Sequence, residues 1–154
     1  MITIRQAGPA DRFELARLAL HFATTHPPYP ALFAGIDVPA RIAFVLDLVF
    51  QLGEQAAIFV AVDVDDVPYA AIAMVENVNI LTGERFGDEL AWWVEPDQRS
   101  SVLVGPRLLV AAEEWTTGRG LGSIRMVAPY PSKVGKFYTR RGYQEIETSY
   151  RKVF

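Results

Sequence analysis

The first half of the chain contains segments in which apolar and polar residues alternate and segments in which apolar residues lie three and four positions apart. Ile2–Ala7 alternates as a half-buried strand does. Apolar positions three and four apart follow it, and again run through Val38–Leu52, a spacing typical of amphipathic helices. Thr25–Pro30, with three prolines, separates the two predicted helices as a loop. Residues 56–80 predict two strands joined by a turn at Asp65–Asp66.

The second half of the chain predicts a strand, a helix, a strand, a short helix and a closing strand. Their ranges are Arg85–Val94, Leu103–Thr117, Ser123–Pro129, the residues before Gly142, and Tyr143–Phe154. The full order is β-α-α-β-β-β-α-β-α-β, without an internal repeat or a linker. The pattern therefore predicts one domain over residues 1–154. We expect an α/β fold with a mixed, mostly antiparallel central sheet, flanking helices and at least one parallel crossover.

Composition narrows the classes of protein. The 154 residues are 51% hydrophobic and 21% charged, which is typical of a globular protein. The chain has no cysteine, which excludes disulfides, thiolate catalysis and cysteine-ligated metals. Its apolar runs are too short to span a bilayer, and its first residues lack the apolar core of a signal peptide. We therefore expect a cytoplasmic protein without a membrane partner.

Charge is distributed unevenly along the chain. Residues 1–98 contain five Lys and Arg against fourteen Asp and Glu, a balance of −9, and residues 99–154 contain ten against four, a balance of +6. Either this is scatter over solvated faces, or a basic half holds an anion beside an acidic half that attracts a cation. The net charge of −3 and the lack of a dense basic stripe argue against nucleic acid as the partner.

The stretch WWVEPDQRSSVLVGPRLL, residues 92–109, passes from a predicted strand through a turn into a predicted helix. The exposed N–H groups at a helix start bind phosphate, and Arg99 and Arg107 add positive charge. The alternative is structural, since Ser100 and Ser101 are also typical residues of a helix N-cap.

The stretch KFYTRRGY, residues 136–143, carries a second candidate group. Phe137 and Tyr138 lie shortly before a glycine of the type that ends helices. Either the tyrosine ring packs against the core with its hydroxyl in water, or the hydroxyl donates a proton to a leaving group.

Taken together, these motifs resemble the GNAT superfamily of acyl-CoA-dependent N-acyltransferases. ITIRQAGPAD resembles the family's first strand and the start of its first helix. ELAWWVEPDQR resembles the strand and the V-x-P-x-x-R run before the pyrophosphate loop, and KFYTRRGYQEIETSY resembles the closing motif. The resemblance spans the whole chain. The short sequences WWV-x-P and ETSY are similar to those of small bacterial and phage-associated members.

The resemblance implies roles for particular residues. Backbone groups of Trp92, Trp93 and Val94 would pair with the pantetheine arm of acetyl-CoA. The implied pyrophosphate site consists of N–H groups and side chains of Arg99, Ser100, Ser101, Val102, Val104, Gly105 and Arg107. Tyr138 would protonate the departing thiolate. Asp88 or Glu89 would draw the proton from the amine, and strand alternation sends these two to opposite faces unless a bulge intervenes.

The loop differs from the family pattern [QR]-x-x-G-x-[GA]. Its single glycine, Gly105, falls one position late and is followed by Pro106, which offers no N–H. Pro131 stands where many members have asparagine.

The function that these expectations indicate is N-acyl transfer, from acetyl-CoA to a primary amine of a small molecule or peptide, by direct attack. The alternative is a non-catalytic module of the same fold that binds acyl-CoA or a protein partner. A nucleotide-binding regulator is a third class, but no G-x-G-x-x-G follows the first strand. His21 and His26 lack a clustered carboxylate pair, so no metal is expected. A two-fold homodimer, to which an exposed terminal strand contributes, is compatible with the sequence.

Overall fold

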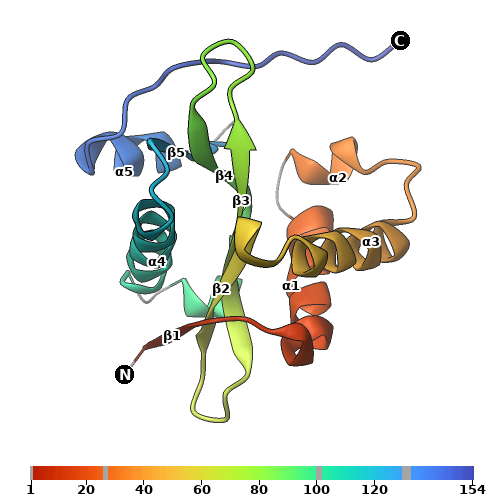
Figure 1. The fold of residues 1–154 in the computed structure, drawn as a ribbon. Coiled ribbons are helices and arrows are strands. Elements are labelled where there is room, and N and C mark those ends of the chain that lie inside the picture. The colour runs from red at the N-terminus through yellow and green to blue at the C-terminus, as the bar shows by residue number, and fades with distance from the viewer. Residues whose placement is uncertain (1, 26–27, 100–101, 130–132) are drawn as a thin grey trace.

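A five-stranded sheet forms the centre of the computed structural model, which describes residues 2–25, 28–99, 102–129 and 133–154. The strands follow one another in chain order across the sheet: β1 (Thr3–Gln6), β2 (Ala56–Val62), β3 (Pro68–Val78), β4 (Arg85–Val94) and β5 (Ser123–Arg125). All neighbours pair antiparallel except β4 and β5, which are parallel. The predicted mixed, mostly antiparallel sheet is confirmed (Figure 1).

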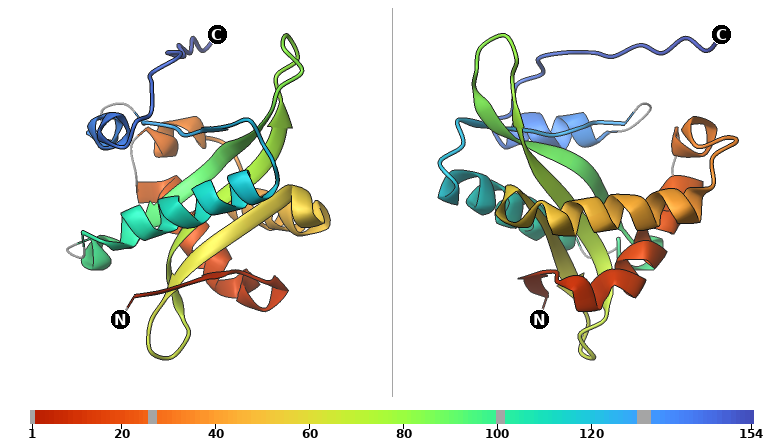
Figure 2. Two further views of the ribbon diagram at one scale, coloured as in Figure 1. Left: turned by 60° about the vertical axis from the view of Figure 1, so that its left-hand side comes forward. Right: turned by 45° about the vertical axis from the view of Figure 1, so that its right-hand side comes forward.

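Helices cover both faces of this sheet (Figures 1 and 2). On one face lie α1 (Arg12–Thr25), α2 (Tyr29–Leu32) and α3 (Val38–Gln51). On the other lies α4 (Val104–Gly118), and α5 (Val134–Arg140) follows beyond the end of β5. The chain crosses over through α4 to make the parallel pair, as such pairs require.

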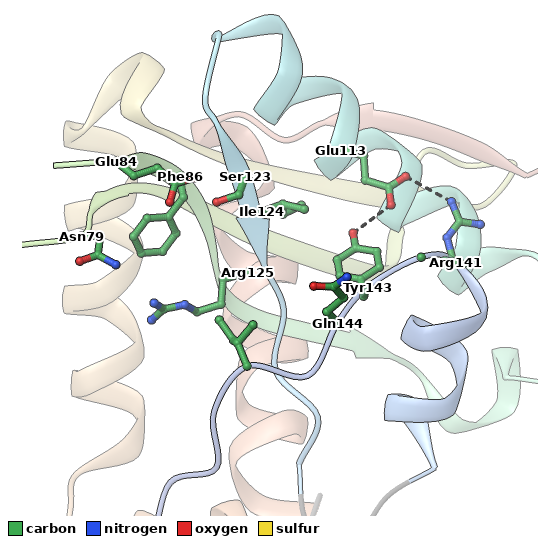
Figure 3. Close-up of a pocket in the computed structure, with 12 residues that line it drawn as sticks. Asn79, Glu84, Phe86, Glu113, Ser123, Ile124, Arg125, Arg141, Tyr143 and Gln144 are labelled. Atoms are coloured by element: carbon green, nitrogen blue, oxygen red, sulfur yellow. Dashed lines mark hydrogen bonds and ion pairs between the residues drawn. The ribbon is translucent and has the colours of Figure 1, made fainter. Parts of the chain in front are cut away.

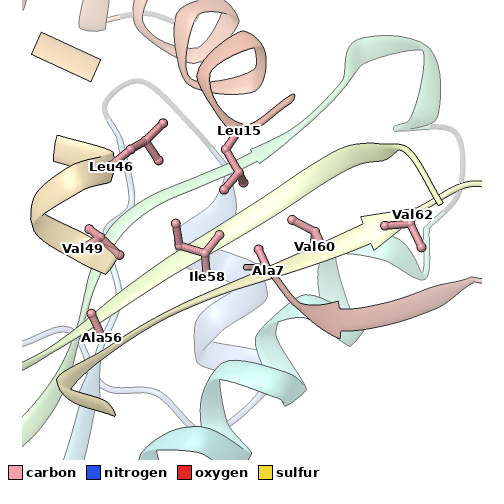
Figure 4. Close-up of a cluster of buried hydrophobic side chains, with 8 residues drawn as sticks. All are labelled: Ala7, Leu15, Leu46, Val49, Ala56, Ile58, Val60 and Val62. Atoms are coloured by element: carbon pink, nitrogen blue, oxygen red, sulfur yellow. The ribbon is translucent and has the colours of Figure 1, made fainter. Parts of the chain in front are cut away.

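Two apolar clusters lie between the sheet and its helices. The cluster under α1 and α3 is drawn in Figure 4 and consists of Ala7, Leu15, Leu46, Val49, Ala56, Ile58, Val60 and Val62. The cluster under α4 consists of Ala61, Ala70, Ile72, Met74, Val104, Leu108 and Ala112. Because β2 contributes to both, its sequence is a continuous apolar run rather than an alternating one.

Local signals in the sequence form as expected at two places. The Asp37 carboxylate accepts a hydrogen bond from the N–H of Ala40 at 3.1 Å, and Pro39 occupies the first turn of α3. At the β2–β3 turn, Asp66 adopts a left-handed φ of 62° and the Asp63 carboxylate accepts from the N–H of Val67.

An ion-pair cluster fixes α1 against the end of β4. The buried Glu95 carboxylate accepts from Arg17 Nη1 at 2.5 Å and lies 3.0 Å from His21 Nδ1. Arg17 Nη2 also donates to the Pro68 carbonyl at 2.9 Å, so one guanidinium joins α1 to two strands. His21, which the sequence did not single out for any role but excluded as a metal ligand, thus takes part in a side-chain contact that positions the helix.

Three predicted elements differ from the structure. The helix α2 begins at Tyr29 within the predicted loop, and β5 ends at Arg125 rather than Pro129. The predicted closing strand is wrong, because residues 143–154 form no strand. After α5 the chain runs away from the sheet, so its alternating pattern meets no strand partner among the described residues (Figure 1). Ser132, whose position before the short helix makes it a cap candidate, lies outside the described residues, as do His26 and Pro131.

The close packing of α4 on β4 generates a stability prediction. A Cβ at Gly87 would lie 2.5 Å from Thr116 Oγ1 and 3.2 Å from its Cγ2, on a threonine that is itself buried. Gly87→Ala should therefore lower the free energy of unfolding by about 1–3 kcal/mol, which urea denaturation measures. Thr116→Ala in the same chain should restore much of the loss. The matched control is Gly118→Ala in α4, where the added Cβ meets nothing within 4 Å, and an equal loss there would contradict the explanation.

Candidate active site

The candidate site begins where β4 and β5 part. The two strands pair only over Phe86↔Ser123, Gly87↔Ile124 and Asp88↔Arg125, whereas β4 continues to Val94. Beyond Asp88, β4 therefore has no strand partner on this side within the described part of the chain. The parting leaves an opening at the middle of the sheet, bounded by the second half of β4.

The backbone of β4 offers hydrogen-bonding groups to this opening. The N–H of Glu95 donates to the Tyr69 carbonyl at 3.1 Å, on the β3 side. In an antiparallel ladder, alternate residues turn their N–H and C=O groups to opposite sides. Trp92 and Val94 therefore turn theirs toward the opening, and the Val94 carbonyl indeed accepts from Arg99 Nε at 2.8 Å. An extended ligand can pair with the other groups as an added strand would.

A bulge in β4 decides which acidic side chain enters the site. Ala91 pairs with Ala73 and Glu89 with Met74, so Leu90 is an extra residue without a partner. Glu89 consequently lies on the α4 face of the sheet, the face of Trp92, rather than opposite to it. Asp88 pairs with Val75 and receives a hydrogen bond from Asn77 Nδ2 at 3.2 Å. The structure thus brings Glu89, and not Asp88, to the opening.

Glu89 and Tyr138 meet in the opening, on either side of one backbone unit. The N–H of Val127 donates to Glu89 Oε2 at 2.9 Å, and the Tyr138 hydroxyl donates to the Val127 carbonyl at 3.1 Å. The same hydroxyl lies 3.4 Å from Glu89 Oε2, a long contact. Sequence reasoning chose both residues separately, and the fold places them together from β4 and α5.

Burial shifts the proton affinities of both groups. Desolvation raises the pKa of Glu89 to about 7, against the hydrogen bonds from Val127 and Tyr138, which lower it. Burial and then the negative charge of Glu89 raise the pKa of Tyr138 well above its ordinary value. At neutral pH the pair therefore combines a carboxylate that exchanges protons readily with a hydroxyl that keeps its proton.

Trp92 forms an aromatic wall beside this pair. Its ring centroid lies 6.1 Å from those of Tyr138 and of Phe137. A Cβ at Gly105 would lie 3.3 Å from Trp92 Cζ2, so the glycine allows the start of α4 to approach the ring. Trp92 Nε1 is buried and has no hydrogen-bond partner among the described residues. Such a donor is rare in a folded protein and calls for a partner, such as a water molecule, an ion or a ligand.

The helix start of the predicted phosphate site lies one residue further along the chain than expected, at Val104 rather than Leu103. A short turn, η3 (Pro96–Gln98), follows β4, and α4 begins at Val104, so Gly105 belongs to the helix and not to the loop. No described side chain caps the N–H groups of Val104 and Gly105. Val102 is exposed, and Ser100 and Ser101 lie outside the described residues.

The two predicted phosphate-binding arginines are engaged elsewhere. Arg99 donates to the Val94 carbonyl, and its guanidinium carbon lies 4.5 Å from the Trp93 ring centroid. Arg107 Nη1 donates to the Ile2 carbonyl at 2.8 Å, which ties α4 to the first strand. Backbone N–H groups are therefore what the described residues offer to a phosphate.

The opposite face of the site is aromatic. Trp93 is buried, and its ring meets Phe22 edge-on at a centroid distance of 6.1 Å. Phe22 in turn contacts Tyr29 of α2 at 4.1 Å. Burial and then the charge of Glu89 raise the pKa of Tyr29, which places this ring within electrostatic reach of the site. Sequence reasoning missed Tyr29, because its one local signal was the proline-rich segment Thr25–Pro30 in which it lies.

The described residues hold no cluster of metal ligands and no candidate membrane span. No group of three His, Cys, Asp or Glu side chains gathers there as metal ligands would. None of the helices in the described ranges is both long enough and apolar enough to span a membrane. A pocket of about 540 Å³ lies at the outer edge of β5 and not at Glu89.

Comparisons with known proteins show the fold. No family model and no curated protein sequence matches the chain. A Pyrococcus furiosus protein assigned as an acetyl transferase has 19% identity, full coverage of both chains and a TM-score of 0.82. AAC(6')-Iy, solved in complex with the bisubstrate analogue CoA-S-monomethyl-acetylneamine, has 19% identity, coverage of 100% and 99%, and a TM-score of 0.71. A Bacillus halodurans transcriptional regulator has 14% identity, full coverage of both chains and a TM-score of 0.76. The chain has the GNAT acetyltransferase fold.

The raised pKa of Glu89 generates a prediction about stability. A carboxyl group whose pKa is raised on folding stabilises the protein below its unfolded value, here 4.5, and this stability is lost as the pH rises through about 7. Glu89→Gln, which keeps the neutral form, should therefore be more stable than the wild type above pH 7, by up to about 3 kcal/mol. Urea denaturation from pH 4 to 8 measures the difference. Parallel curves for the two proteins over this range would contradict the shift, and agreement below pH 4.5 serves as the internal control.

Proposed function

We propose that the protein is an N-acyltransferase that transfers an acetyl group from acetyl-CoA to a primary amine by direct attack. The observation that carries the proposal is the meeting of the Glu89 carboxylate and the Tyr138 hydroxyl where β4 and β5 part. These are a proton acceptor and a proton donor, which are the two groups that the reaction needs beside a held thioester. The fold shared with acetyltransferases supports the same reaction class.

The residues around the opening fit acetyl-CoA as co-substrate, which would supply the activated acyl group. The outward-facing backbone groups of Trp92 and Val94 suit the amides of its pantetheine arm. The buried donor Trp92 Nε1 would gain an acceptor there. The uncapped N–H groups of Val104 and Gly105 suit its pyrophosphate, since a helix start attracts anions.

Proton transfers follow from the positions of the two side chains. Once the ammonium group has lost one proton to water, its nitrogen bonds to the acyl carbon and the carbon–sulfur bond breaks, while Glu89 takes the second proton from the nitrogen and Tyr138 gives one to the sulfur. An N–H group of β4 near Val94 polarises the acyl oxygen. The contact between Tyr138 and Glu89 then allows the proton on the carboxyl group to return to the tyrosine. No covalent intermediate with the protein is needed, which suits a chain without cysteine.

The acceptor is proposed as a cationic amine of a small molecule or a peptide. The first 98 residues, which supply the α1–α3 face, carry a net charge of −9. Tyr29 and Phe22 would form an aromatic wall on this side. The negative charge and the aromatic wall suit amines of small molecules and of peptides alike.

A non-catalytic module of the same fold is the second candidate. Its support is that Arg99 and Arg107 are held by protein carbonyls rather than turned toward the start of α4. One of the similar structures is described as a transcriptional regulator, so not every protein of this fold is described as an enzyme.

Binding separates the candidate functions. Calorimetry should show saturable binding of acetyl-CoA, with ATP and NAD binding more weakly, because only acetyl-CoA has an arm that pairs with β4. Lack of acetyl-CoA binding at millimolar concentration, or preferential binding of ATP or NAD, would contradict the enzyme. Binding without release of free CoA across a panel of primary amines would favour the non-catalytic module.

Kinetics of two variants test the proton transfers. Tyr138→Phe should lower kcat by about 10²-fold while the Kd for acetyl-CoA changes little, because general acid–base groups contribute about 10²–10⁴-fold. Wild-type kcat/KM should rise with pH through about 7 as Glu89 ionises, and Glu89→Gln should lose both activity and this rise. Asp88→Asn is the matched control and should retain activity. Unchanged turnover of Tyr138→Phe would remove the tyrosine from the role of acid.

A further inference from the structure

Arg99 is held at the end of β4 with part of its guanidinium group unused. Its Nε donates to the Val94 carbonyl at 2.8 Å, and its guanidinium carbon lies 4.5 Å from the ring centroid of Trp93. Its Nη1 and Nη2 donate to no acceptor among the described residues. The hydrogen bond and the stacking together fix the plane of the group. The two outer nitrogens are therefore a preorganised pair of donors on an exposed, charged side chain.

Two other arginines of the protein have carboxylate partners within the chain. Arg17, near the same end of β4, donates to the buried Glu95 carboxylate. Arg141, in the pocket at the outer edge of β5, donates to Glu113 Oε2 at 3.2 Å (Figure 3). Arg99 has no such partner in the described part of the chain. Its fixed donor pair therefore suits a carboxylate from outside the chain.

A row of aromatic rings leads from Arg99 toward Glu89. The Trp93 ring, on which Arg99 stacks, meets Phe22 edge-on at a centroid distance of 6.1 Å. Phe22 lies 4.1 Å from Tyr29, and both of these rings are partly exposed. Burial and then the charge of Glu89 raise the pKa of Tyr29, so this end of the row lies within electrostatic reach of the carboxylate. The row thus has a proton acceptor at one end and a cation at the other.

The pairing of β4 with β3 sets the length of this row. Glu89 pairs with Met74. Trp93 pairs with Ala71, three residues away from Met74 along β3. At about 3.4 Å per residue, these two positions of β4 are about 10 Å apart along the strand. A molecule whose nitrogen lies at Glu89 therefore reaches Arg99 with a group about 10 Å away.

We propose that the acceptor is a primary amine with an apolar body and a carboxylate about 10 Å from its nitrogen, and that Arg99 binds this carboxylate. The apolar body lies along Phe22 and Tyr29. One guanidinium matches the single charge of a carboxylate, and its planar fork matches the two oxygens. The inference rests on the proposed acyl transfer, whose acceptor it narrows from amines in general to amino carboxylates.

The face on which Arg99 lies assigns it to the acceptor rather than to a pyrophosphate. The Trp93 ring beneath it packs against Phe22 of α1, on the α1–α3 face of the sheet. The uncapped N–H groups of Val104 and Gly105 begin α4, which covers the other face. The stacking on Trp93 therefore turns the guanidinium group away from the start of α4.

Kinetics with a matched pair of amines test the assignment. The pair is 8-aminooctanoate, whose extended chain spans a similar length, and its methyl ester, which lacks the charge. The wild type should acetylate the acid with a kcat/KM about 10-fold above that of the ester, because a hydrogen-bonded charge pair contributes about this factor. Arg99→Gln should lose the preference, and Arg99→Lys, which keeps the charge without the fork, should retain part of it.

The matched control is Arg41→Gln, which changes another arginine stacked on an aromatic ring, 4.9 Å from the Phe44 centroid on α3. This variant should keep the preference of the wild type for the acid. Equal kcat/KM for acid and ester in the wild type, or a preference that survives in Arg99→Gln, would overturn the proposal.

Equilibrium binding separates this inference from acyl transfer itself. Calorimetry with protein saturated with free CoA, which permits no turnover, should give a Kd for 8-aminooctanoate about 10-fold below that of the ester, and Arg99→Gln should abolish the difference. If this difference is found but no amine is acetylated, acyl transfer is wrong and the carboxylate site stands. If amines are acetylated without the difference, the carboxylate site is wrong and acyl transfer stands. A Kd for acetyl-CoA that rises about 10-fold in Arg99→Gln would assign the arginine to the co-substrate and also overturn the proposal.

Discussion

The parting of β4 and β5 is the constraint on which the rest of the molecule depends. Two parallel strands can separate inside a protein only if the backbone groups that they release find other partners. Val127, in the chain just beyond β5, finds both in the site: its N–H donates to Glu89 and its carbonyl accepts from Tyr138. The two candidate catalytic side chains are therefore also the groups that hold the opening apart. The hydrogen bonds that keep the two strands apart are also the ones that position the candidate catalytic groups.

Two glutamates six residues apart, Glu89 within β4 and Glu95 just after it, show how local partners set proton affinity. Glu89 has a backbone N–H and a tyrosine as partners, and desolvation raises its pKa to about 7. Burial of Glu95 would raise its pKa too, but hydrogen bonds from His21 and Arg17 hold it below its ordinary value. The charged carboxylate of Glu95, just after β4, anchors α1. The carboxyl group of Glu89, in the middle of β4, can take up and release a proton in the site.

The sequence predicted what depends on local pattern. The strand Arg85–Val94 has the bounds that its composition indicated, and Asp37 caps α3 as its position suggested. The choice between Asp88 and Glu89 was not predictable, because the bulge at Leu90 depends on how β4 registers against β3. Arg107 could not be placed either, since the carbonyl that holds it belongs to Ile2, more than one hundred residues away. Residues 143–154 alternate as a strand does, but alternation cannot supply the partner that a strand requires.

The extra residue at Leu90 gives the site an unusual sensitivity to chain length. The location of the Glu89 carboxylate depends on β4 having one residue more than the facing part of β3. Insertion of one residue into β3 between Ala73 and Met74 would give Leu90 a partner, and regular alternation along β4 would then turn Glu89 to the face opposite to Trp92, with every side chain of the site still encoded. Substitutions at Leu90, which is exposed, would leave the count intact. An in-frame insertion at this point of β3 would therefore separate the fold from its chemistry without changing any candidate site residue.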